Sequence, residues 1–251
     1  MNKKLKIKNI FGENLDILLE GNEKSDQIII FIHGYGTDKN EGFTSYLDLS
    51  RYLRKEYFII RFDQSSYGKS EGEQYEFQFQ KAAGDLDSII RYAKKQYPDK
   101  TRNLIAHSLG TFIVSLLSPY EIRKTVFTSI VNSNTKYASR ELEKRIRAKG
   151  GIVKKDGITV YIRSRGVQLI GKDFWKTLEN LDPISYIEEL ATKTQLAIFK
   201  PMQDDVLKNK YFDEYKKIKG IEYHEVNGDH NFKNPKDREA LFEEIKAFLI
   251  R

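Results

Sequence analysis

Ser108 lies between small residues, in the sequence A-H-S-L-G. The short apolar run 103–106 predicts a buried strand and residues 109–117 predict a helix, so the serine falls on a strand-to-helix turn. Such a turn is sharp and strained, and it needs small neighbours such as Ala106 and Gly110 because backbones come close there. An ordinary helix would use the same serine only as its N-cap. Because a strand and a helix bracket it, we interpret Ser108 as a candidate nucleophile.

A serine nucleophile needs a general base, and the chain has four histidines that could serve. His230 stands in the polar loop N-G-D-H-N-F, between a predicted strand at residues 222–226 and a final helix at 235–250. A loop at the carboxyl end of a strand can bring an imidazole to a serine at a neighbouring strand end. We expect structural roles for the other three histidines, at a loop, beside the serine and within a strand: His33, His107 and His224.

The acid that orients the base should follow the predicted strand 196–199, which gives the chain order serine, aspartate, histidine. Two candidates stand in P-M-Q-D-D-V, Asp204 and Asp205. We favour Asp204, because residues 206–209 are predicted to begin a helix and this leaves the first carboxylate on the turn. Asp229 is next to the base in sequence and cannot easily reach its ring.

A developing oxyanion needs backbone N–H donors, and glycines let the backbone approach closely. The predicted strand 28–32 runs into H-G-Y-G, so the Tyr35 N–H is one candidate donor and the Leu109 N–H, after the nucleophile, is the other. The turn-rich segment 61–72 is expected to brace this site. Glycine-rich phosphate-binding motifs are absent from the sequence, so nucleotide chemistry has no support.

The elements that must position these residues follow from apolar patterning. Short β-rich runs alternate with segments of helical period, which predicts a mostly parallel sheet with helices on both faces. Residues 3–8 and 15–20 are expected to form an antiparallel hairpin or edge. The buried strands are predicted at 28–32, 58–62, 103–106, 125–128 and 196–199, and the helices at 42–55, 79–97 and 235–250.

The alternation stops between residues 131 and 182, which we interpret as a lid inserted into a core formed by residues 1–130 and 183–251. The lid is expected to contain a basic helix at 139–149 and a hairpin turning near 155–157. Residues 136–165 contain ten Lys or Arg and three acidic residues. Their local net charge of +7 equals the net charge of the whole chain. A basic lid could attract anionic substrates or lipid headgroups.

Composition excludes several classes of protein. The chain has 251 residues, 39% of them hydrophobic and 31% charged, which suits one globular domain with an insertion. It has no cysteine, so disulfides, thiolate catalysis and zinc–thiolate sites are excluded. The N-terminal residues lack the apolar run of a signal peptide, and no stretch is long enough for a transmembrane helix. We expect a cytoplasmic protein that needs no metal or organic cofactor.

Five motifs in order resemble the α/β-hydrolase superfamily, and most closely bacterial feruloyl and cinnamoyl esterases with their monoacylglycerol-lipase and serine-aminopeptidase-like relatives. Ala106 and Pro201 depart from this pattern, since each stands where glycine is more usual. The motifs are H-G-Y-G-T-D-K-N-E, R-F-D-Q-S-S-Y-G-K-S-E-G, A-H-S-L-G, Q-D-D-V and G-D-H-N-F.

The resemblance implies an α/β-hydrolase fold and hydrolysis of small carboxylic esters through an acyl-enzyme. It assigns Ser108, Asp204 and His230 as the triad and the Tyr35 and Leu109 amides as the oxyanion hole. A monoacylglycerol lipase, a lysophospholipase or a serine aminopeptidase would use the same residues. Epoxide hydrolases and haloalkane dehalogenases are disfavoured because their nucleophile is aspartate.

A non-enzymatic alternative is binding of an anionic surface through the basic lid. Nucleic-acid binding is not expected, because the basic stretch 136–165 has few aromatic residues that could stack on bases, namely Tyr137 and Tyr161.

Overall fold

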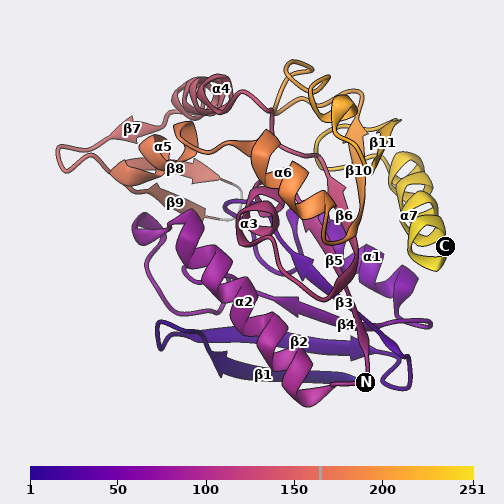
Figure 1. The fold of residues 1–251 in the computed structure, drawn as a ribbon. Coiled ribbons are helices and arrows are strands. Elements are labelled where there is room, and N and C mark those ends of the chain that lie inside the picture. Colours follow the sequence, from indigo (N-terminus) through magenta and orange to yellow (C-terminus); the bar gives the residue numbers. More distant parts are fainter. Residues whose placement is uncertain (164–165) are drawn as a thin grey trace.

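The computed structural model describes residues 1–163 and 166–251, and its centre is a twisted, mostly parallel sheet (Figure 1). In the described residues this sheet has eight strands in the order β1-β2-β4-β3-β5-β6-β10-β11. The β1–β2 pair is antiparallel and the sheet is mostly parallel, as the sequence predicted. The β2–β4 pair is also antiparallel, and all other pairs of this sheet are parallel. The strands are β1 (Asn2–Lys8), β2 (Asn14–Gly21), β3 (Gln27–Ile32), β4 (Phe58–Phe62), β5 (Thr101–His107), β6 (Ile122–Thr128), β10 (Gln195–Pro201) and β11 (Ile221–Val226).

Helices cover both faces of the sheet (Figure 1). Side chains alternate along each strand, so that Ile28 and Ile30 of β3 enter one apolar core while Ile29 and Phe31 enter the other. The first core packs against α2 (Phe79–Gln96), α3 (Leu109–Leu117) and α6 (Pro183–Ala191), and the second against α1 (Ser45–Leu53) and α7 (Pro235–Ile250).

The expectation of one helix over residues 42–55 needs a correction. Residues Gly42–Thr44 form a separate 3-10 turn, and the α-helix begins only at Ser45. Phe43 and Thr44 have φ of 51° and 59°, a left-handed conformation that interrupts the helix. Two further 3-10 turns are Gln74–Glu76 and Tyr215–Lys217.

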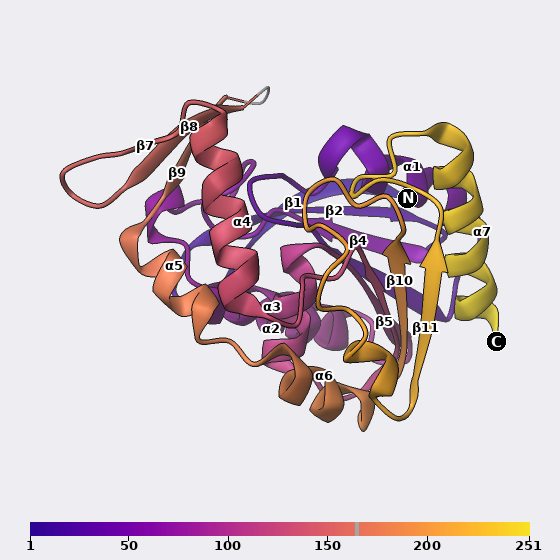
Figure 2. The ribbon, with the colours of Figure 1, turned by 90° about the horizontal axis from the view of Figure 1, so that it is seen from above.

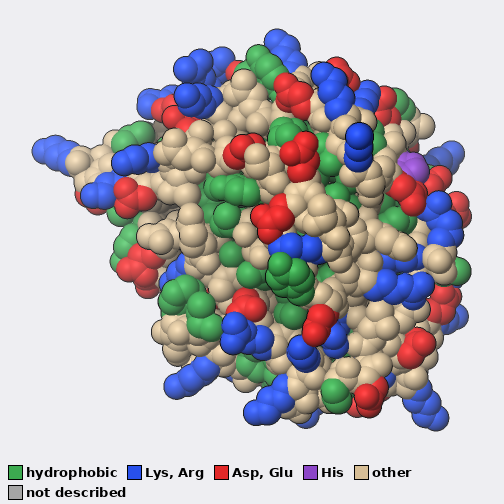
Figure 3. Space-filling view, viewed as in Figure 1, with side chains coloured by type: hydrophobic (Ala, Val, Ile, Leu, Met, Phe, Trp, Pro, Cys, Tyr) green, Lys and Arg blue, Asp and Glu red, His purple; other side chains and the backbone are tan. Residues whose placement is uncertain are grey.

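Between β6 and α6 the chain leaves the main sheet, over the segment that the sequence predicted to be inserted. It forms α4 (Thr135–Ala148), a small antiparallel sheet of β7 (Ile152–Val153), β8 (Thr159–Arg163) and β9 (Gly166–Ile170), and α5 (Lys172–Glu179). Seen from above, the β7–β8 hairpin projects from the body of the molecule (Figure 2). Lys and Arg side chains gather over α4 and this hairpin (Figure 3). Within the described residues, none of the helices combines the length and the hydrophobicity needed to cross a bilayer.

Candidate active site

Ser108 occupies a strained turn between β5 and α3. Its backbone has φ of 52° and ψ of −124°, a conformation that residues with a side chain rarely adopt. Gly110 permits the tight turn, because a Cβ atom there would lie 2.6 Å from the Ile32 carbonyl oxygen. The Ser108 side chain makes no capping hydrogen bond to α3, so the alternative of an ordinary helix N-cap is wrong. The geometry directs the hydroxyl away from the helix and into the space above the sheet.

The structure brings the three residues predicted as a triad into one hydrogen-bonded chain. The Ser108 Oγ lies 3.0 Å from Nε2 of His230, and Nδ1 of His230 lies 2.8 Å from Oδ2 of Asp204. The three residues follow the carboxyl ends of β5, β11 and β10, where parallel strands leave a crevice. His230 and Asp204 are buried, so bulk water does not weaken their contact.

Asp204, and not Asp205, holds the imidazole. The other oxygen of Asp204, Oδ1, accepts the N–H groups of Val206 and Leu207 at 2.8 and 2.7 Å, which locks the carboxylate in place. Asp205 points to the surface and pairs with Lys233. The helix expected at residues 206–209 is absent and turns stand there instead, because Lys208 has φ of 54°, a left-handed conformation that interrupts a helix.

The other three histidines make contacts that suit structural roles. The backbone N–H of Gln64 donates to Nε2 of His33, whose ring shapes the loop after β3. His107 is buried with Nδ1 3.0 Å from the Thr128 hydroxyl, and His224 stacks on Phe199. None of these three rings contacts the Ser108 hydroxyl by a hydrogen bond in the described residues.

The predicted oxyanion donors stand on either side of the serine. Leu109 is the first residue of α3, so its N–H has no partner inside the helix. Opposite it, the loop after β3 comes so close that a Cβ on Gly34 would lie 3.2 Å from the Cβ of Ser108. The ring of Tyr35 packs against Phe77 and Phe174, at centroid distances of 5.4 and 4.7 Å, which anchors the backbone of this loop.

Glu41 is a residue of this site that the sequence analysis did not single out. It is buried, with φ of 61°, and its carboxylate accepts the N–H groups of Gly34 and Gly42. It thereby holds the loop that carries the Tyr35 amide beside Ser108. The motif H-G-Y-G-T-D-K-N-E ends on this glutamate, but nothing in the spacing shows that its side chain turns back onto the glycine.

The segment after β4 braces the same loop, as predicted. Asp63 is fully buried and forms an ion pair of 2.6 Å with Lys39, while its oxygens also accept the backbone N–H groups of Lys39 and Lys69. Position 68 requires glycine, because the Cβ atom of any other residue would clash with the Asp63 carboxylate at 2.2 Å. These buried contacts fix the position of the loop opposite Ser108.

The comparisons with known proteins agree with this architecture. Residues 27–149 match the family model for the alpha/beta hydrolase fold. Similar solved structures cover nearly the whole chain. The chain has the α/β-hydrolase fold. No curated protein matches the sequence significantly.

Three solved structures with this fold are esterases from different organisms. An esterase of Pyrococcus furiosus is 18% identical with a TM-score of 0.77, covering 100% of this chain and 91% of its own. An esterase of Butyrivibrio proteoclasticus, determined with ferulic acid bound, is 16% identical with a TM-score of 0.76 and 98% coverage of both chains. The esterase domain of a Rhodothermus marinus protein is 19% identical with a TM-score of 0.73, covering 99% and 97%. At these identities the likeness shows the fold.

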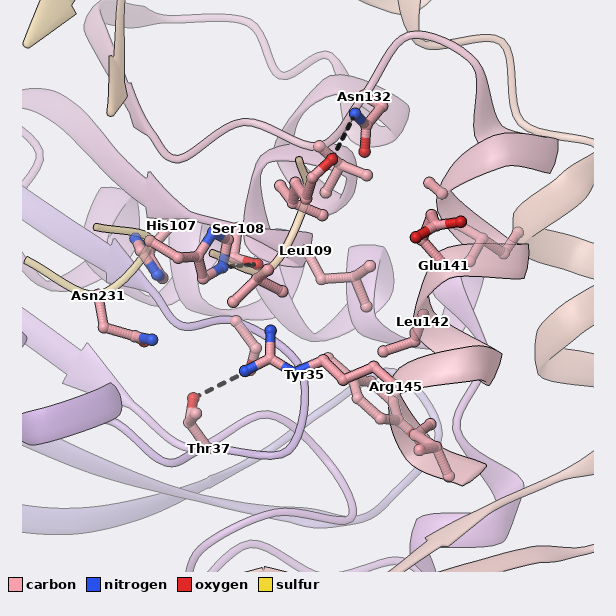
Figure 4. A pocket seen from close by; sticks show the side chains of 18 of the residues that line it. Tyr35, Thr37, His107, Ser108, Leu109, Asn132, Glu141, Leu142, Arg145 and Asn231 are labelled. Atoms are coloured by element: carbon pink, nitrogen blue, oxygen red, sulfur yellow. Dashed lines mark hydrogen bonds between the residues drawn. The ribbon is translucent and has the colours of Figure 1, made fainter. Parts of the chain in front are cut away.

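In this α/β-hydrolase fold, a cavity of about 120 Å³ lies above Ser108. Its walls come from the loop after β3, from the turn after β10 and from α4 of the inserted segment, which stands at the right in Figure 4. Most of the lining is apolar, including Leu109, Val131, Ala138, Leu142, Ile146 and Leu207. Within the described residues, no group of three or more metal-ligating side chains is arranged to hold a metal ion.

The pKa values of Asp204 and His107, beside Ser108, depart from their ordinary values. Burial raises the pKa of Asp204, but the charge and hydrogen bond of His230 and the two backbone donors outweigh it and hold the pKa below 3.8. Burial lowers the pKa of His107 to about 4. Because the rings of His107 and His230 are only 5.2 Å apart, a neutral His107 avoids repelling an imidazolium at His230.

The buried His107 should make stability depend on pH. Between its folded pKa of about 4 and the ordinary value of 6.5, the unfolded chain binds a proton that the folded chain does not. Its contribution to stability is therefore complete above about pH 6.5 and is lost as the pH falls through 4, by about 3 kcal/mol in total. Urea unfolding at several pH values measures this loss.

His107→Gln is the control for this pH dependence. This variant should show a flatter decline of the free energy of unfolding between pH 6.5 and 4. The Asp204 contribution is lost mainly as the pH falls through its lowered pKa, and it is present in both proteins, so the difference between them reports on His107. Equal slopes for the two proteins would show that His107 is not the group responsible.

Proposed function

We propose that the protein is a serine hydrolase of small carboxylic esters, with Ser108, His230 and Asp204 as its catalytic triad. The observation that carries this proposal is the hydrogen-bonded chain of these residues, which begins at a strained serine. That the similar structures include esterases of three organisms supports the reaction class. Position 108 holds a serine, which favours acyl transfer over chemistry that starts from an aspartate nucleophile.

The geometry suits the two half-reactions of ester hydrolysis. Oγ of Ser108 attacks the ester carbonyl while Nε2 of His230 accepts its proton, and the Leu109 and Tyr35 amides donate to the oxyanion. Asp204 holds the proton-bearing Nδ1 and stabilises the imidazolium. The imidazolium then protonates the leaving alcohol. A water molecule, deprotonated by His230, attacks the acyl-enzyme and releases the acid.

The size of the cavity favours a short acyl group. At about 120 Å³ it is smaller than the ~150 Å³ cavity that accommodates benzene in another protein. A feruloyl group contains a substituted benzene ring and a propenoyl arm, so it would require α4 to move outward. Acetyl to butyryl esters need no such movement.

The charges of the lid support a binding function less well. Several cations of α4 are paired within the helix, with Lys144 on Glu141 at 2.8 Å and Arg147 on Glu143 at 2.7 Å. Such exposed pairs reduce the field that would attract an anionic surface. A hydrolase with an inserted lid therefore accounts for more of the structure than a binding module does.

A panel of esters tests the reaction class and the acyl preference together. We expect kcat/KM for p-nitrophenyl acetate and butyrate to exceed that for methyl ferulate, for a monoacylglycerol and for an aminoacyl amide, by at least about 10-fold. The acyl groups of the ferulate and of the monoacylglycerol are too large for the cavity, and these substrates also lack an activated leaving group. Ethyl acetate and ethyl ferulate, which share a leaving group, are therefore compared as a matched pair that isolates the steric effect. Faster hydrolysis of the feruloyl ester in that pair would contradict the size argument, and hydrolysis of the amide alone would indicate a peptidase.

A further inference from the structure

One face of α4 places charged side chains in the wall of the catalytic cavity. Glu141 and Arg145 are four residues apart on one face of α4, and Lys149 follows as the C-cap residue at the end of the helix. All three line the cavity together with Ser108 and His230. The guanidinium of Arg145 extends from α4 across the cavity toward Thr37, on the side where Ser108 and Leu109 stand (Figure 4).

Within α4, Arg145 is the cation that lines the cavity, and it has no acidic partner among the described residues. Its Nη1 is buried without a hydrogen-bond partner among the described residues, and none of their carboxylates forms an ion pair with it. By contrast, Lys144 and Arg147 have pairs at the surface of the same helix. Arg145 is half-buried, and leaving its Nη1 buried without a partner is costly, which favours an anion that arrives from outside.

The acidic groups nearest the cavity are already occupied by other partners. The Glu41 carboxylate accepts the Gly34 and Gly42 N–H groups, and Asp204 accepts the His230 imidazole. Glu141 bonds to Lys144 at 2.8 Å. Among the described residues, the cavity therefore presents a guanidinium without an acidic partner within a mostly apolar wall.

We propose that Arg145 binds a carboxylate on the acyl part of the substrate, so that the protein hydrolyses monoesters of short dicarboxylic acids. This inference rests on the proposed function and adds the substrate class. A guanidinium suits this role because its planar N–H groups match the two oxygens of a carboxylate. The carboxylate belongs to the acyl part because that part stays bound as the acyl-enzyme through both half-reactions. A cavity of about 120 Å³ limits the acid to a short chain.

The test compares one charged and one neutral ester of similar length, mono-p-nitrophenyl glutarate and p-nitrophenyl butyrate. Arg145→Gln keeps a polar side chain of similar length but removes the charge. We expect this variant to lower kcat/KM for the glutarate ester by about 10- to 100-fold, the range that a charge-assisted hydrogen bond provides. For the butyrate ester, kcat/KM should stay within about 2-fold of the unaltered protein.

Arg147→Gln is the matched control. Arg147 is on the same helix, pairs with Glu143 at the surface and does not line the cavity. The Arg147→Gln substitution should change kcat/KM by no more than about 2-fold for either ester. If Arg147→Gln also lowers kcat/KM for the glutarate ester, the preference for that ester comes from the overall positive charge of α4. This result would overturn the assignment to Arg145.

A binding measurement separates this inference from the proposed function. In a Ser108→Ala background, calorimetry with glutarate itself should show binding, and adding Arg145→Gln should weaken it by at least about 10-fold. If Arg145→Gln lowers activity on both esters equally, Arg145 only ties α4 to the core and the inference is overturned while the esterase stands. If no ester is hydrolysed, the proposed function fails, and absence of glutarate binding overturns the inference independently.

Discussion

Replacing the Ser108 hydroxyl by hydrogen, in Ser108→Ala, is expected to lower kcat for a short ester by about 10⁶-fold. The reason is that the triad acts as a unit, so that loss of the nucleophile removes nearly all of its contribution. The remaining rate would come from the oxyanion donors and from substrate binding alone. Alanine keeps the Cβ that φ of 52° already accommodates, so the turn should persist. Single-turnover and steady-state kinetics measure the effect.

The control for this variant is Ser88→Ala, which removes another buried hydroxyl. The Ser88 hydroxyl donates to the Gly84 carbonyl within α2 and does not line the cavity. Ser88→Ala should keep kcat within about 2-fold of the value for the unaltered protein. A fluorophosphonate label should modify the unaltered chain and Ser88→Ala but not Ser108→Ala. Labelling of Ser108→Ala, or retention of most of its activity, would show that another residue is the nucleophile.

The second large effect is expected at the acid. Asp204→Asn should lower kcat by about 10⁴-fold, because the amide of asparagine can donate to Nδ1 of His230 and favour the tautomer whose Nε2 carries the proton. An Nε2 that carries a proton cannot accept the one from Ser108. The loss should lie in kcat more than in KM, since Asp204 bonds to His230 and to backbone amides and not to the cavity.

The neighbouring residue gives a matched comparison. Asp205→Asn changes the same group one position later, but Asp205 pairs with Lys233 at the surface, 3.3 Å away. Its kcat should remain within about 3-fold of the unaltered protein. A larger loss at position 205 than at 204 would mean that the imidazole turns to the other carboxylate in solution.

Much of the architecture follows from local patterns. Continuous apolar runs identified the strands that are buried on both faces, such as β3, because neither face of such a strand can carry polar residues. The turn at Ser108 was predictable since Ala106 and Gly110 mark where backbone must pass closely. The start of α1 was not, because Phe43 and Thr44 adopt left-handed angles that their residue types do not encode.

The roles of Glu41 and Arg145 depend on contacts between distant segments. Glu41 returns to Gly34, seven residues earlier, only because the loop between them folds back on itself. Arg145 enters the catalytic cavity because α4, inserted after β6, lies over the strand ends. In the sequence it is one of ten cations between residues 136 and 165, and nothing there distinguishes it from Arg147.

The sequence by itself determined the order of elements and the α/β-hydrolase fold, and it predicted the three side chains that we propose for acyl transfer, because these depend on residue type and on spacing along the chain. The tertiary structure decided which aspartate faces the imidazole, which glutamate holds the loop opposite the serine and which arginine of α4 faces the cavity. These depend on the direction in which a side chain leaves the backbone. Adjacent residues such as Asp204 and Asp205 have the same chemistry but point to opposite environments, and only packing of the whole chain fixes that direction.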